Sequence, residues 1–398
     1  MKKLTLISLA VASSLYAGGY KIPETSVNGV ALSAANVARS HGADAAYYNP
    51  ANMVFMADEN AIEADLMVIG LDPTNFKGKG SQLGVDIDAE SETFFIPSLN
   101  YVSPKLGNAR IGVNISVPGG LTKRWNDSPA KDKAEEFTLQ VIEINPTVAF
   151  AVTDNFAFAA GFRLLHSEGI VKSTSAISRD MEGDSFDVGY NLALAYKPTK
   201  SLEFGLTYRS KVNLTQEGTA KLYDVGSTTL PVYDGGSTVS VPLPAFLNIA
   251  AAYTFSTQTT IEIVYERNFW SAYSTLDFNY AGDIGNLKEK LDDPIAKDWK
   301  NTNAYRIGIT QEFDAVTLMA GAVIDETPVP DSTLSYELPD SDSLSFSLGG
   351  RYDLTDSINM GISALYSMRD DREANNEIEG TFSNSDVLII SAGLGFKF

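Results

Sequence analysis

The feature that most constrains the fold of this chain is a two-residue alternation of side chains that recurs along most of its length. In 357–368, 386–398 and 202–209, one face carries apolar side chains and the other carries mainly small or polar ones. Successive side chains of a β-strand point to opposite faces of a sheet, so the alternation predicts strands with one apolar face. Such strands suit a barrel whose outer surface meets lipid and whose interior is filled or wet.

The connections between these runs alternate between short and long. We count about fourteen runs, an even number that suits an antiparallel barrel, at 59–71, 92–103, 109–118, 137–152, 155–168, 186–197, 201–213, 245–255, 259–270, 303–312, 316–325, 343–352, 357–369 and 386–398. The short connections are 153–155, 197–201, 255–259, 312–316 and 352–357, and the long polar ones are 72–91, 119–136, 169–185, 214–244, 271–302, 326–342 and 370–385. Outer-membrane barrels have short periplasmic turns and long external loops, whereas a soluble β-sandwich has no reason for this order. We therefore expect an all-β fold, a transmembrane antiparallel barrel in the outer membrane of a Gram-negative bacterium.

Residues 1–17 carry the pattern of a secretory signal peptide. Lys2 and Lys3 precede an apolar stretch at 4–15, and Ala17 precedes two glycines. A basic start followed by a short apolar core is typical of export signals, and the stretch is too short for a membrane anchor helix. We expect cleavage after Ala17.

Composition excludes several classes of function. The chain has no cysteine, so it forms no disulfide and has no cysteine nucleophile. Its formal net charge of −20 argues against nucleic acid as a partner, because nothing neutralises phosphates. The chain ends on Phe398, and a last strand that ends in an aromatic residue resembles the signal read by the barrel-assembly machinery. An aromatic girdle at the membrane interface explains the same residue without any signal.

Residues 18–58 precede the first predicted strand and do not alternate. The stretch 27–56 is rich in alanine and other small residues and mildly helical in character. About forty residues ahead of a barrel with a lumen can fit inside it, since small side chains suit a confined space. We expect an N-terminal hatch at 18–58 inside a barrel formed by 59–398.

Two stretches give a specific resemblance to a known family. The sequence "GGYKIPETSVNGVALSAANVARSHGADAAYYNPANM" is similar to the N-terminal hatch of the long-chain fatty-acid transporter (FadL) family, with its Asn-Pro-Ala at Asn49, Pro50 and Ala51. The second stretch, 321–354, resembles the family's Asp-x-(Thr/Ser)-Pro-Val-Pro segment, carried by Asp325, Thr327, Pro328, Val329, Pro330, Pro339 and Asp340. Weaker matches at 299–309 and 206–218 follow in the expected order, so the resemblance spans nearly the whole chain after the signal.

The resemblance implies a fourteen-stranded barrel, a hatch that acts as a gate at Asn49, Pro50 and Ala51, and passive uptake of hydrophobic molecules. Long-chain fatty acids are the first expectation, and hydrocarbons or aromatic compounds remain open. Expected partners are the substrate, outer-membrane lipid, lipopolysaccharide and the barrel-assembly machinery. Two alternatives stay open: a general porin for hydrophilic solutes, which would keep an open lumen, and a structural or adhesive surface barrel.

Charged side chains are predicted to face the barrel interior. By parity they are Glu143, Arg163, Glu203, Arg209, Glu262, Glu266, Arg306 and Arg351. One interpretation is a structural network of paired charges, because unpaired ions at low dielectric are costly. The other is that Arg163 and Arg306, in the outer halves of their strands, bind a substrate carboxylate through the planar guanidinium, with Leu165 as an apolar neighbour.

The third predicted strand meets Pro118, Gly119 and Gly120 without a polar turn. Proline removes a backbone donor, and glycines remove the side chains that pack a sheet. One interpretation is a simple strand end. The other is an inward kink that makes a lateral opening, which the resemblance to the FadL family implies.

Catalysis, a cofactor and a metal site are not expected. The only histidines are His41 and His166, and neither forms a pair at ligand spacing. His166 and Ser167 are adjacent and so point to opposite faces of a strand. The acidic pairs at 292–293 and 370–371 fall in predicted external loops, where we interpret them as solvated charge, with loose divalent binding as the alternative.

Overall fold

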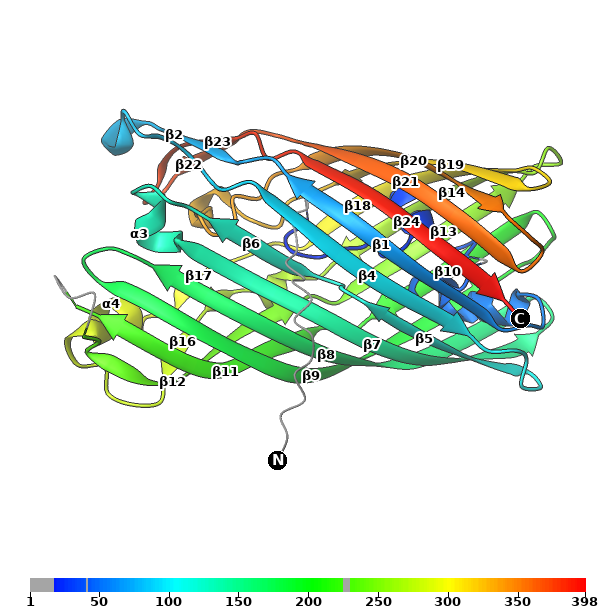
Figure 1. Ribbon diagram of the computed structural model, residues 1–398, viewed down its shortest axis with the longest axis horizontal. Coiled ribbons are helices and arrows are strands. Elements are labelled where there is room, and N and C mark those ends of the chain that lie inside the picture. The colour runs from blue at the N-terminus through cyan, green and yellow to red at the C-terminus, as the bar shows by residue number, and fades with distance from the viewer. Residues whose placement is uncertain (1–17, 41, 225–229) are drawn as a thin grey trace.

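The computed structural model describes residues 18–40, 42–224 and 230–398. The predicted signal peptide and His41 lie outside these residues. Strands dominate the described chain and form a closed antiparallel barrel, with short turns at one end and long connections at the other (Figure 1). No helix among the described residues is long and apolar enough to cross a membrane.

The barrel wall has 14 strands, as the sequence predicts. Eleven positions are continuous strands, and three are strands interrupted into two segments. The continuous strands are β1 (Ala61–Leu71), β4 (Glu92–Val102), β7 (Glu136–Thr153), β8 (Phe156–Ser173), β9 (Ser178–Tyr196), β14 (Thr259–Asn268), β18 (Thr302–Glu312), β19 (Val316–Asp325), β20 (Ser343–Asp353), β21 (Ile358–Arg369) and β24 (Val387–Lys397). The interrupted ones are β5 (Ala109–Ser116) with β6 (Gly120–Arg124), β10 (Leu202–Arg209) with β11 (Val212–Tyr223), and β12 (Tyr233–Leu243) with β13 (Phe246–Thr254). The first and last strands close the ring, since β1 pairs with β24 from Ala61↔Lys397 to Leu71↔Val387.

Two predicted loops are largely strand. The stretch 169–185 continues β8 and β9, which pair out to Ser173↔Arg179, and most of 214–244 forms the hairpin of β11 and β12. The prediction was wrong there for a physical reason. Beyond the hydrocarbon layer both faces of a strand meet water or polar groups, so the alternation disappears while backbone pairing continues.

The remaining connections at the long-loop end hold short elements. They are β2 (Asn75–Gly78), β3 (Asp86–Asp88), β15 (Thr275–Leu276), β16 (Phe278–Tyr280), β17 (Ile295–Ala296), β22 (Arg372–Asn375), β23 (Glu379–Ser383), α3 (Ala130–Ala134), α4 (Lys288–Leu291), η2 (Gly80–Gln82), η3 (Trp270–Ala272), η4 (Gly285–Leu287) and η5 (Asp331–Thr333). A small sheet joins β22, β23, β2 and β3. These connections therefore form a packed structure at the long-loop end of the barrel.

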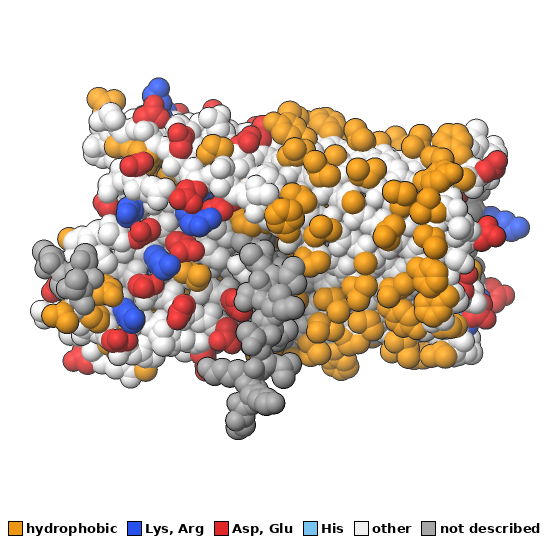
Figure 2. All heavy atoms as spheres, viewed as in Figure 1, with side chains coloured by type: hydrophobic (Ala, Val, Ile, Leu, Met, Phe, Trp, Pro, Cys, Tyr) orange, Lys and Arg blue, Asp and Glu red, His pale blue; other side chains and the backbone are white. Residues whose placement is uncertain are grey.

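The surface divides into two zones along the barrel. Figure 2 shows hydrophobic side chains gathered over the half with the short turns and acidic and basic ones over the other half. Large apolar side chains such as Leu66, Phe95 and Ile390 are about half exposed on the outer face. An outward apolar band with a polar interior is the expected surface of a barrel in lipid.

Residues 18–40 and 42–58, the N-terminal segment, lie inside the ring of strands (Figure 1, dark blue). The segment contains α1 (Val27–Ala31), α2 (Ala45–Tyr48) and η1 (Pro50–Phe55). One side chain links its turns: Asp44 Oδ2 accepts hydrogen bonds from Ser26, Asn28 and Asn36 at 2.8–3.0 Å. Three donors on one carboxylate oxygen hold the segment folded on itself, together with a small apolar cluster of Ala34, Tyr47 and Tyr48.

The wall makes room for the segment with inward glycines. A β-carbon on Gly321 would stand 2.3 Å from the Leu32 carbonyl carbon, and one on Gly205 would stand 2.5 Å from the Val37 oxygen. Any side chain there would push the backbone of the segment away from the wall. The segment and the wall are thus complementary in shape.

Candidate functional site: an interrupted wall beside the N-terminal segment

The third strand of the wall is interrupted at the Pro-Gly-Gly sequence. β5 ends at Ser116, and β6 begins at Gly120. β5 pairs with β4 only from Val102↔Gly112 to Leu99↔Ile115. Above this point the β4 residues 92–98 pair with β1 on one side, and no ladder among the described residues joins them to β6. The backbone therefore departs from β4 at the position where the sequence suggests a kink.

The backbone groups freed at this interruption bind the N-terminal segment. Ile22 N donates to Pro118 O at 2.9 Å, and Gly120 N donates to Tyr20 O at 2.8 Å. A β-carbon on Gly119 would stand 2.7 Å from Tyr20 O, so this close approach requires glycine. Residues 20–22 thus supply hydrogen bonds to the backbone of Pro118 and Gly120, which have no partner on β4.

The inner side of the interruption is apolar. Ile22, Phe94, Ile96 and Val117 are buried together in one cluster, with side chains from β1, β21 and β24. An apolar molecule leaves water favourably into such surroundings, at about 25 cal/mol for each Å² of apolar surface. The cluster and the interrupted wall lie next to each other because Val117 belongs to both.

The predicted ligand Arg163 is buried and engaged by the protein. Its Nε donates to Glu143 Oε2 at 2.9 Å, and Arg209 pairs with the other oxygen of the same carboxylate. Its Nη1 donates to the Ser210 carbonyl at 2.6 Å, at the interruption between β10 and β11. Because β8 continues to Ser173, Arg163 lies near the middle of its strand and not in the outer half. Leu165 faces inward beside it and is buried.

Arg306 joins the wall to the N-terminal segment. Its Nη1 donates to Ser33 O at 2.9 Å and lies 3.4 Å from Glu24 Oε1, and its Nη2 lies 3.2 Å from Glu266 Oε1. Lys21 also donates to Glu266 Oε1, at 2.5 Å. The parity prediction for these inward charges is confirmed by their burial, and the structural network is the interpretation that their partners favour. Carboxylate binding by either arginine stays a prediction.

The predicted gate residues lie at the contact between the segment and the wall. Asn49 Nδ2 donates to Val37 O at 2.8 Å and to Leu194 O of β9 at 3.1 Å, and its Oδ1 accepts from Ala51 N. Pro50 is the first residue of η1, where its missing N–H costs nothing. The Asn-Pro-Ala sequence therefore starts a short helix and ties it to the barrel.

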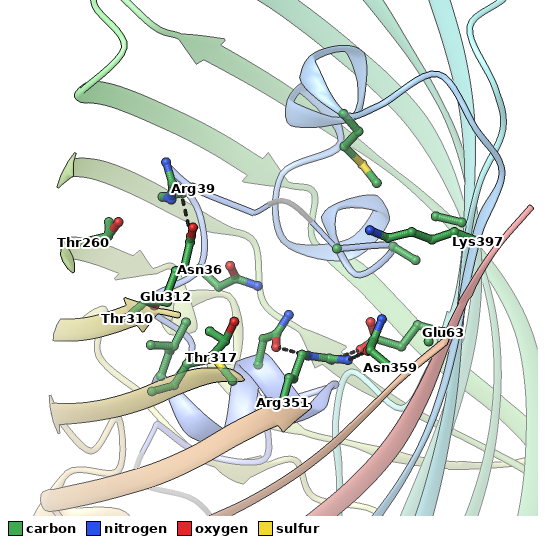
Figure 3. A pocket seen from close by; sticks show the side chains of 18 of the residues that line it. Asn36, Arg39, Glu63, Thr260, Thr310, Glu312, Thr317, Arg351, Asn359 and Lys397 are labelled. Carbon is green, nitrogen blue, oxygen red and sulfur yellow. Dashed lines mark hydrogen bonds and ion pairs between the residues drawn. The ribbon is translucent and has the colours of Figure 1, made fainter. Parts of the chain in front are cut away.

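A cavity of about 290 Å³, lined by both apolar and charged side chains, separates the segment from the wall at the short-turn end. Figure 3 shows its side chains, with Arg39 paired to Glu312 and Arg351 bound to Glu63 and Asn359. Thr260, Thr310, Thr317 and Lys397 also belong to the polar part of the lining, and Leu32, Met319 and Phe396 belong to its apolar part. This end of the lumen therefore presents charged and hydroxyl groups beside apolar ones.

Sequence reasoning missed an aromatic cluster at the long-loop end. Tyr20 packs against Trp270 and Trp299 with ring centroids 4.8 and 5.7 Å apart, and Tyr273 packs on Trp299 at 4.8 Å. Both indoles are almost fully buried, although Trp299 falls in a predicted polar loop and Trp270 is the last residue of a predicted strand. The signal was available, since a tryptophan in an otherwise solvated loop indicates burial. Tyr20 connects this cluster to the interrupted strand.

Within the described part of the chain, the remaining candidates do not form a catalytic arrangement. His166 faces outward and stacks on Phe186 at 4.4 Å, and Ser167 faces inward, as the parity predicts. Asp293, Asp370 and Asp371 are exposed at the long-loop end.

A closed membrane barrel with its own N-terminal segment in the lumen and an interrupted strand beside an apolar cluster has the form of an outer-membrane transporter of hydrophobic compounds. The family model described as "Outer membrane protein transport protein (OMPP1/FadL/TodX)" matches residues 8–388. The chain belongs to this family, whose members transport hydrophobic compounds across the outer membrane and are not enzymes.

Individual relatives agree with this assignment. A long-chain fatty acid transport protein of Escherichia coli O6:H1 is 25% identical over 423 residues, covering 91% of this chain and 90% of that protein. The crystal structure of a Pseudomonas aeruginosa FadL homologue has the same fold, with a TM-score of 0.83 at 18% identity, covering 95% of this chain and 99% of that one. The Ralstonia pickettii toluene transporter TbuX superposes with a TM-score of 0.73 at 17% identity, covering 94% and 98%.

Proposed function

We propose that this protein takes up long-chain fatty acids and releases them sideways, through the interruption at Pro118, Gly119 and Gly120, into the membrane. The observation that carries the proposal is the contrast between the two exits. The apolar cluster of Ile22, Phe94, Ile96 and Val117 lies at the interruption, whereas the cavity at the short-turn end has charged and hydroxyl side chains among its apolar ones. A hydrocarbon chain gains about 0.8 kcal/mol for each methylene it keeps out of water, so it favours the lateral exit.

Passage along this route is passive. The external polar leaflet is the barrier, and a chain that has crossed it moves downhill into hydrocarbon. Tyr20 and the two indoles form a buried aromatic cluster on the external side of the interruption, and a substrate from outside reaches the interruption after these side chains move apart. The relatives named for fatty acids and for toluene support a hydrophobic substrate and leave its class to experiment.

In this proposal the N-terminal segment is the gate of the lumen. The segment is buried in the lumen, and this argues against a general porin, which needs an open aqueous path. A purely adhesive barrel has no use for either the segment or the interruption. The surface partners we propose are outer-membrane lipid and lipopolysaccharide around the barrel, and the barrel-assembly machinery during insertion.

The experiment compares ion conductance through the purified protein with the uptake of hydrophobic solutes by cells that express it. Purified protein in planar bilayers should give no steady large conductance, while a strain that expresses it should take up labelled oleate and hexadecane faster than a deletion strain. If the deletion strain grew as well as the expressing strain on a panel of fatty acids and hydrocarbons, the proposal would be contradicted. Steady ion conductance with no gain in hydrophobic uptake would support the porin instead.

A further inference from the structure

A buried charge cluster between the N-terminal segment and the wall contains one carboxylate without a close cation. The cluster has two cations, Lys21 and Arg306, and three carboxylates, Glu24, Glu266 and Asp325, all of them buried. Glu266 has both cations as partners, and Glu24 shares Arg306. Asp325 Oδ2 is 4.0 Å from Arg306 Nη2, and Asp325 Oδ1 has no hydrogen-bond partner in the described chain. A buried carboxylate whose only nearby cation is this distant is costly to ionise, so a further cation beside Asp325 would stabilise the site.

Gly18 lies directly against this carboxylate. A β-carbon built on Gly18 would stand 3.0 Å from Asp325 Oδ2 and 3.3 Å from Oδ1. The next residue is held in place, because Gly19 N donates to Asp340 Oδ2 at 3.2 Å. A β-carbon on Gly19 would stand 2.7 Å from the Trp270 ring. Both glycines have positive φ, +90° and +78°, and neither position leaves room for a side chain.

We propose that removal of residues 1–17 turns the nitrogen of Gly18 into an α-ammonium that binds Asp325 and completes the buried cluster. The nitrogen and the β-carbon position are substituents of the same Cα at nearly equal bond lengths. A rotation of about 120° around the Cα–C bond therefore brings the freed nitrogen to the point beside Asp325. At that point the ammonium lies within the range of a charge-assisted hydrogen bond. The uncleaved peptide nitrogen carries no charge and cannot play this role.

This ion pair fixes the start of the chain that binds the interrupted strand. With Gly18 and Gly19 held by Asp325 and Asp340, Tyr20 and Ile22 stay hydrogen-bonded to Gly120 and Pro118. Processing during export thus completes the structure beside the interruption. The inference rests on cleavage after Ala17 and does not depend on which substrate is carried or where it leaves.

The test measures the protonation of the N-terminal amine in the purified, processed protein. Mass spectrometry first establishes that the chain begins at Gly18. The rate of an amine acylation specific for the N-terminus is then followed against pH. The midpoint should lie about one pH unit or more above that of the same protein after unfolding, because a neighbouring carboxylate favours the ammonium form.

Two variants separate the ion pair from general burial. Asp325→Asn keeps the shape and should return the midpoint to that of the unfolded chain, and Gly18→Ala should do the same by filling the space beside the carboxylate. Asp331→Asn, at an exposed aspartate of η5, is the matched control and should change nothing. Heat-modifiable migration on gels confirms that each barrel is folded. A chain that begins elsewhere, or a midpoint that Asp325→Asn and Gly18→Ala both leave unchanged, would overturn the inference.

Discussion

Asp44 shows how single side chains hold the N-terminal segment together. Burial away from water raises the pKa of Asp44 to about 6 from an ordinary 3.8, and the nearby Glu63 carboxylate adds to the rise. Its Oδ2 accepts all three hydrogen bonds, while Oδ1 has no partner in the described chain and has room for the proton. A raised pKa means that the seated segment binds this proton more tightly than a released one. The contribution is present in full below 3.8 and is lost as the pH rises through about 6.

We therefore expect the segment to seat more firmly as the pH falls from 7.5 to 5. Access of a protease to the segment, measured on the intact barrel, should decrease over this range. Asp44→Asn places an amide at the free oxygen and keeps the acceptor, so its access should depend much less on pH. Asp331→Asn should behave like the unchanged protein. Equal pH dependence in Asp44→Asn and the unchanged protein would assign the effect to other groups.

Arg306 is a second residue whose role the structure makes testable. Its replacement by leucine leaves Glu24 and Glu266 short of a partner, and breaking a buried pair costs about 3–5 kcal/mol. We expect Arg306→Leu to loosen the segment and to weaken binding of a fatty acid and of an alkane equally, as measured by titration of the purified barrel. Arg267→Leu, on the outer face of the neighbouring strand β14, is the control. Selective loss of fatty-acid binding would instead support the carboxylate-binding prediction.

At the scale of elements, the sequence predicted the membrane part of each strand and little beyond it. The alternation placed Ile358 and Leu388 outward and Arg163 and Glu262 inward correctly, because one side of the wall meets lipid. It could not find the outer ends of β8 and β9, where both faces are polar. The partners of the inward charges were also out of reach. Arg306 and Glu24 are 282 residues apart in the sequence, and their contact forms only when the barrel closes with the segment inside.

Removal of the N-terminal segment tests whether the barrel folds independently of it. A closed barrel satisfies its own backbone hydrogen bonds, so deletion of 20–48 should leave a heat-modifiable barrel in the membrane. The barrel should leak small ions with a preference for cations. Glu262 loses the backbone N–H groups of 37–39, Glu203 loses Arg39, and Glu266 loses Lys21. The reversal potential across a salt gradient measures this preference. Absence of the barrel from the membrane would show that the segment is needed for folding.

At the scale of the whole molecule, polar and apolar groups are divided between two ends of one lumen. Aromatic side chains gather at the long-loop end, an apolar cluster lies at the interruption, and charged groups line the cavity at the short-turn end. The same polypeptide start, residues 18–22, contacts the first two regions. On the proposed route, a hydrophobic molecule that enters from outside passes from the first region to the second and leaves through the wall.

The measurement that tests this account most directly is the initial rate of oleate uptake by a barrel with a repaired third strand. Pro118→Val restores a backbone donor and a strand-forming side chain where the chain leaves β4, and it keeps the glycine that the contact of position 119 with Tyr20 O requires. Gly70→Val is the matched control, because a β-carbon there would be 3.9 Å from its nearest neighbour, Leu388 O. The account predicts that Pro118→Val folds, binds oleate at its surface and takes it up several-fold more slowly, while Gly70→Val matches the unchanged protein. Uptake at the normal rate by folded Pro118→Val would contradict lateral release and place the exit past the N-terminal segment.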